Sequence, residues 1–87
     1  MHTVRGVTHL GWEDKLILRI IFAYMNHYPG EYVCKKRIQS KVGTMPSDII
    51  DIMIDLGFIL SKPSTPVTVY GITNKARVWA LEQINDS

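Results

Sequence analysis

The sequence has a single cysteine, Cys34, so no disulfide can form within the chain. The fold must therefore be held by packing. A hydrophobic content of 46% and a charged content of 21% are typical of a globular protein rather than a disordered one. At 87 residues, the chain is long enough for one modest core and too short for two.

Long hydrophobic runs are also absent. The most apolar stretch, residues 16–25, is interrupted by Arg19 and is far shorter than the roughly 20 residues that span a bilayer. Residues 1–15 lack the basic head and small-residue cleavage site of a secretory signal. We therefore expect a cytoplasmic protein with no membrane partner.

Motifs that carry chemistry are missing as well. The three histidines, His2, His9 and His27, do not have the spacing of metal ligands. There is no glycine-rich phosphate loop, nucleophile elbow or pair of catalytic carboxylates. The sequence predicts a protein that is not an enzyme and that needs neither a cofactor nor a metal.

Charge is small in sum but uneven along the chain. The net charge is +2, yet residues 33–44 contain four basic residues and no acid, and residues 45–57 contain three acids and no base. The basic residues are Lys35, Lys36, Arg37 and Lys41, and the acids are Asp48, Asp51 and Asp55. Two neighbouring segments of opposite sign are the most informative feature of the sequence.

The first predicted helix covers residues 12–28. Glu13 and Asp14 fall in its first turn, where acids favour the helix dipole, and Pro29 ends it. We expect residues 1–11, which have no strong periodicity, to form a flexible arm. Everything from residue 12 to residue 87 then belongs to one domain.

A helix-turn-helix is predicted over residues 33–60. Cys34, Ile38 and Val42 recur every fourth residue and form the inward side of a short basic helix. Gly43 suits a left-handed backbone after that helix. The second helix is expected over residues 46–56, with Pro46 in its first turn and oxygens of Ser47 and Asp48 near its free amides. Its predicted inward residues are Ile49, Ile52, Met53 and Leu56.

A hairpin and a last helix complete the predicted order. Residues 31–33 are β-prone and suit an edge strand, and residues 58–60 and 67–72 read as strands around the loop 61–66. Thr73 or Asn74 caps a helix that ends near residue 85. This helix is expected to bury Ala76, Trp79, Ala80 and Ile84.

This order of elements, with the phrase LGFI followed by VYGITNKAR, resembles the winged helix-turn-helix superfamily. It is most similar to small one-domain regulators of the MarR or PadR kind and to small winged-helix proteins of bacteriophages. The resemblance implies an α+β, mainly α fold with a three-helix core, a β-hairpin wing and a C-terminal helix.

The resemblance also implies binding of duplex DNA and regulation of transcription. In that superfamily the second helix of the motif enters the major groove and the preceding helix crosses the phosphates. The positions that match are Lys35, Lys36, Arg37 and Lys41 for the backbone, Thr44 and Ser47 for the groove, and Lys62 for the wing.

A second hypothesis stays open, because the predicted recognition helix offers no Arg, Lys, Asn or Gln to the bases. Its acidic side would instead bind a basic protein partner, as in a small phage-type inhibitor or adaptor. The residues of that surface are Asp48, Asp51 and Asp55, with Ile50 and Ile54 expected to be partly exposed beside them.

The first helix has more apolar positions than a simple amphipathic helix needs. Leu18, Phe22 and Met25 extend its apolar face, and Val78 or Trp79 offers a matching surface on the last helix. These residues favour a homodimer formed through the first and last helices.

Overall fold

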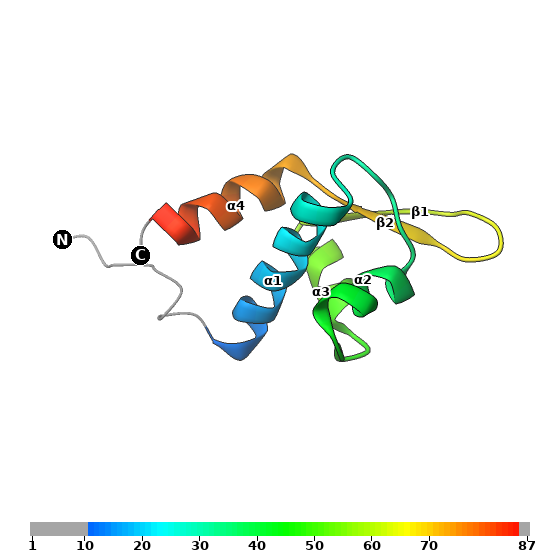
Figure 1. Ribbon diagram of the computed structural model, residues 1–87, viewed down its shortest axis with the longest axis horizontal. Coiled ribbons are helices and arrows are strands. Elements are labelled where there is room, and N and C mark those ends of the chain that lie inside the picture. The colour runs from blue at the N-terminus through cyan, green and yellow to red at the C-terminus, as the bar shows by residue number, and fades with distance from the viewer. Residues whose placement is uncertain (1–10, 86–87) are drawn as a thin grey trace.

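The computed structural model describes residues 11–85 and has an α+β, mainly helical architecture (Figure 1). The elements are α1 (Trp12–His27), α2 (Lys35–Val42), α3 (Ile49–Asp55), β1 (Ile59–Lys62), β2 (Val69–Ile72) and α4 (Asn74–Asn85). Within this range, no helix is long and apolar enough to cross a membrane. The predicted arm, residues 1–11, lies outside the described residues except for Gly11.

Helix α1 is the centre of the fold. It contacts α2, α3, α4 and β2, and Figure 1 shows it running between the other helices. Its buried residues are Leu16, Ile17, Leu18, Ile20, Ile21, Ala23 and Tyr24. Leu18, which the sequence assigned to a dimer surface, is therefore covered by its own chain. The helix ends at His27, one residue before the predicted end, and Tyr28 is its C-cap.

Helix α2 has the predicted inward side. Ile38 and Val42 are buried, and Cys34 is a partly buried N-cap residue. The Gly43 N–H donates to the Gln39 carbonyl at 2.8 Å, which ends the helix. Gly43 has the predicted positive φ, 99°, but its ψ of −162° lies outside the left-handed helical region that the sequence analysis expected.

Helix α3 is shorter than predicted. It begins at Ile49 rather than at Pro46, because residues 47 and 48 form a turn. The Asp48 side chain makes no capping hydrogen bond, so the predicted cap is wrong.

The inward side of α3 also differs from the prediction. Its buried residues are Ile49, Ile50 and Met53, whereas Ile52 is half-buried and Leu56 is 42% exposed. Nearly every non-acidic position of this helix is apolar, so the docking against α1 and β1, not the periodicity, decides which residues are covered.

Strands β1 and β2 form an antiparallel hairpin with Ile59 opposite Ile72 and Lys62 opposite Val69. The first strand begins and ends later than predicted, and the second begins two residues later than predicted. The predicted edge strand is confirmed at one residue, because Val33 and Tyr70 exchange backbone hydrogen bonds of 2.9 and 2.8 Å.

Helix α4 begins with the predicted cap. The Ala76 N–H donates to Thr73 Oγ1 at 3.1 Å, and that hydroxyl donates to the Gly57 carbonyl at 2.7 Å. Ala76 and Ala80 are buried as predicted, but Ile84 is 45% exposed. Gln83 takes the next buried position, because it continues the stripe of residues 76 and 80, and Ile84 lies about 100° further round.

Tyr24 ties α1 to β2. Its hydroxyl, on a side chain that is 1% exposed, donates to the Tyr70 carbonyl at 2.6 Å. Burial, with smaller contributions from Cys34, Tyr70 and Tyr28, raises the pKa of this hydroxyl above its ordinary value.

Replacing Gly43 by alanine should lower the free energy of unfolding by about 1–3 kcal/mol, because its φ and ψ together are essentially restricted to glycine. No atom lies within 4 Å of an added Cβ, so the cost would come from the backbone alone. Gly43→Asn should be no milder, since asparagine tolerates the left-handed helical region but not this one. Urea denaturation measures both, and recovery by asparagine would contradict this conformation.

Stability should fall as the pH rises above about 10, because there the unfolded chain loses the Tyr24 proton that the folded chain keeps. Tyr24→Phe should make this decline shallower and lower the unfolding free energy at neutral pH by about 1 kcal/mol. Tyr28→Phe is the matched control, since its hydroxyl lies 3.4 Å from the Arg37 carbonyl. An equal effect of both substitutions in denaturation curves between about pH 9 and 11 would argue against the assignment.

Candidate nucleic-acid interface

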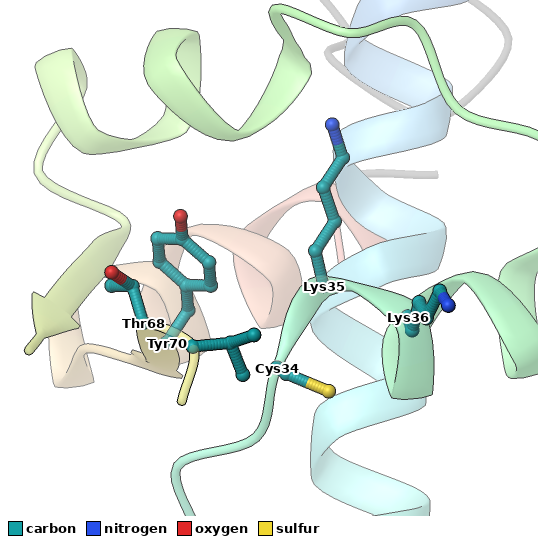
Figure 2. A pocket seen from close by; sticks show the side chains of 6 residues that line it. Cys34, Lys35, Lys36, Thr68 and Tyr70 are labelled. Carbon is teal, nitrogen blue, oxygen red and sulfur yellow. The ribbon is translucent and has the colours of Figure 1, made fainter. Parts of the chain in front are cut away.

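The N-terminus of α2 faces β2 across an open hollow of about 430 Å³ (Figure 2). The two hydrogen bonds between Val33 and Tyr70 position the hollow, because Val33 lies directly before the residues that begin α2. The residues that line it are Cys34, Lys35, Lys36, Val67, Thr68 and Tyr70.

Polar groups of this hollow point toward α3. Figure 2 shows the Lys35 side chain and the hydroxyls of Thr68 and Tyr70 directed to the same side. The Lys35 ammonium donates to the Ser47 carbonyl at 3.3 Å, which links the start of α2 to the turn before α3. Lys35 and Ser47, predicted separately from the sequence, are thus brought together.

A second hollow adjoins the turn between α2 and α3. It is lined by Lys36, Gln39, Ser40, Gly43 and Thr44. Lys36 lines both hollows, so it joins them into one surface. We call the following residues the α2–β2 surface: Lys35, Lys36, Thr44, Ser47, Thr68 and Tyr70.

Arg37 and Lys41 lie on another side of α2. At about 100° per residue, Arg37 is a quarter-turn or more from Lys36, and Lys41 is one turn beyond Arg37 on the same side. The Arg37 guanidinium lies over the ring of Tyr28, 4.9 Å from its centre. This contact directs it toward the end of α1.

Lys62 lies on the other face of the hairpin from the α2–β2 surface. It is opposite Val69, and side chains alternate along a strand, so Lys62 and Tyr70 point to opposite faces. The Lys62 ammonium is 5.5 Å from the centre of the Tyr32 ring. The hairpin therefore presents hydroxyls on one face and a cation beside an aromatic ring on the other.

The acidic side of α3 is open. Asp48, Asp51 and Asp55 are all exposed, as the second hypothesis requires. Ile54 is partly buried, but Ile50 is only 4% exposed, so its predicted place on this surface is wrong. Ile50 packs into the core because α3 turns this residue toward the other helices.

Thr68, Tyr70 and Gln39 were not predicted as site residues. The alternation of the second strand does place Thr68 and Tyr70 on one face. Which face meets α2 depends on the pairing of Val33 with Tyr70, and the sequence does not fix that register. Gln39 carries no signal apart from its position near the turn.

No cluster of three or more potential metal ligands occurs in the described part of the chain. The predicted absence of a metal or cofactor stays a prediction. Cys34, expected as a core residue, is partly buried at the edge of the hollow.

Comparison with known proteins gives no match: no family model fits the chain, and no curated protein or solved structure has significant similarity to it. Function must therefore be argued from the surfaces described above.

Proposed function

We propose that the chain is a winged helix-turn-helix protein that binds duplex DNA and regulates transcription. Support comes from the order of elements: α2 and α3 are joined by a short turn, the hairpin follows α3 directly, and α4 closes the domain (Figure 1). In this reading, α3 is the recognition helix and the hairpin is the wing.

The observation that carries the proposal is the composition of the α2–β2 surface. Lys35 and Lys36 lie at the N-terminus of α2, where the helix dipole favours anions. Hydroxyls of Thr68 and Tyr70 lie across the hollow from them, and hydroxyls and lysines are the usual donors to DNA phosphates. One stretch of sugar-phosphate backbone would lie along this surface.

Helix α3 would add selectivity rather than affinity. Its exposed carboxylates repel phosphates, so close approach is unfavourable unless a carboxylate accepts a hydrogen bond from a cytosine amine. We therefore assign the affinity to the α2–β2 surface and expect weak binding at physiological salt.

Removing a phosphate contact should reduce the salt dependence of binding. For Lys36→Ala, we expect the slope of log Kd against log salt on mixed-sequence duplex to become shallower by about 0.9. Lys41→Ala removes the same charge from the same helix but on another side, so it should change the slope much less. Fluorescence anisotropy between low and moderate salt measures both.

Two outcomes would overturn this proposal. One is the absence of any affinity for duplex DNA at low salt. The other is an equal loss of slope in the two lysine variants, which would indicate general attraction to a basic helix instead of contact at the α2–β2 surface.

The exposed acidic side of α3 favours a second candidate function, in which the chain binds a basic protein. Asp48, Asp51 and Asp55 project from one side of α3, and Leu56 adds exposed apolar area at its end. A partner with a lysine- or arginine-rich surface would complement this side, and its binding would also weaken with salt.

Reversing the charge of Asp51 separates the two functions. If the chain binds DNA, Asp51→Lys should strengthen non-specific binding to duplex, because it replaces repulsion of phosphates by attraction. If it binds a basic protein, the same substitution should abolish capture of that partner from a lysate, and Lys36→Ala should not. An unchanged affinity for DNA together with lost capture would favour the second function.

A further inference from the structure

Helix α4 carries apolar side chains on its outer side. Val78, Leu81 and Ile84 are 47%, 48% and 45% exposed. Leu56, at the end of α3, is exposed as well and lines the same groove as Val78. Apolar side chains that gather in this way mark an interaction surface more often than isolated ones do.

A groove of about 460 Å³ runs between the end of α3 and α4. Phe58 and Trp79 line it with their rings, whose centres are 5.1 Å apart. Two charged side chains, Lys75 and Glu82, also line it, and the Lys75 ammonium lies 5.9 Å from the centre of the Phe58 ring. The groove therefore combines apolar area with one cation and one anion.

The two charges are placed symmetrically along α4. Lys75 and Glu82 are seven residues apart, so they lie on nearly the same side of the helix and about 10 Å apart along its axis. Their midpoint falls between Val78 and Trp79. If a second α4 packs antiparallel about this midpoint, Lys75 of each copy meets Glu82 of the other.

We propose that this face of the protein binds a second copy of the chain. The contact is a two-fold interface in which the α4 helices run antiparallel. Its residues, which we call the α4 surface, are Leu56, Lys75, Val78, Leu81, Glu82 and Ile84. In a two-fold contact each residue pair occurs twice, so both charge pairs are attractive while the apolar side chains are buried between them.

This interface differs from the predicted one, because α1 contributes little to it. Leu18 is buried, and Phe22 and Met25 are half-buried against the core. One side of a 12-residue helix and the end of α3 offer less than the roughly 800 Å² per partner of a standard interface. We therefore expect a dimer whose Kd is in the micromolar range or weaker.

Charge reversal tests the pairing. K75E places two negative groups opposite each other at both ends of the contact, and E82K places two positive groups there. Each substitution should weaken self-association about tenfold at low salt. The double variant K75E/E82K restores two attractive pairs and should recover the wild-type affinity.

Mixing the two single variants tests the antiparallel geometry itself. A K75E chain presents two negative groups, and an E82K chain presents two positive groups, so their heterodimer has attractive pairs at both ends. Sedimentation equilibrium without DNA should show stronger association in the equimolar mixture than in either variant alone. Thermal unfolding of each variant controls for folding, since both residues are exposed.

Dimerisation of the wild type, loss in both single variants and recovery in the mixture and the double variant would support the α4 surface. A wild-type mass that stays at the monomer value of 9.9 kDa at all accessible concentrations would overturn it. Self-association that neither substitution changes would also overturn it. Because DNA is absent from this measurement, its outcome is independent of the proposed DNA binding.

Discussion

The fold depends on the burial of α1. Buried residues cover more than half of its circumference, so the helix is stable in water only when other elements surround it. α2, α3, β2 and α4 all contact it. The hydrogen bond from Tyr24 to the backbone of Tyr70 fixes the position of β2 against α1. The rest of the architecture follows from this requirement.

The arrangement around α1 also creates the surface that we assign to DNA. Because Val33 pairs with Tyr70, the chain enters α2 directly beside β2, and Lys35 reaches the turn before α3. Residues from three separate parts of the sequence are brought into one surface. The charges of the protein are consequently divided: cations at the start of α2, carboxylates along α3, and a mixed apolar surface on α4.

Local signals predicted the helices and their ends well. Pro29, Gly43 and Thr73 act at or near the ends of helices as their backbone chemistry requires. The covered side of α3 was not predictable, because almost every residue that is not an aspartate is apolar, and Ile50 rather than Leu56 is buried by docking on its neighbours. The same holds for the candidate site. The sequence shows the cations of α2, but only the tertiary structure separates Lys36 from Arg37 and adds Tyr70 to the surface.

Titration of the labelled protein with a short mixed-sequence duplex, followed by amide chemical shifts, tests the central claim most directly. If the α2–β2 surface holds the DNA backbone, the largest shifts should fall at the start of α2, at Thr44 and Ser47, and at Thr68 and Tyr70. The outer side of α4 should change little. Shifts confined to α4 or to the carboxylates of α3, or no shifts at low salt, would contradict the account.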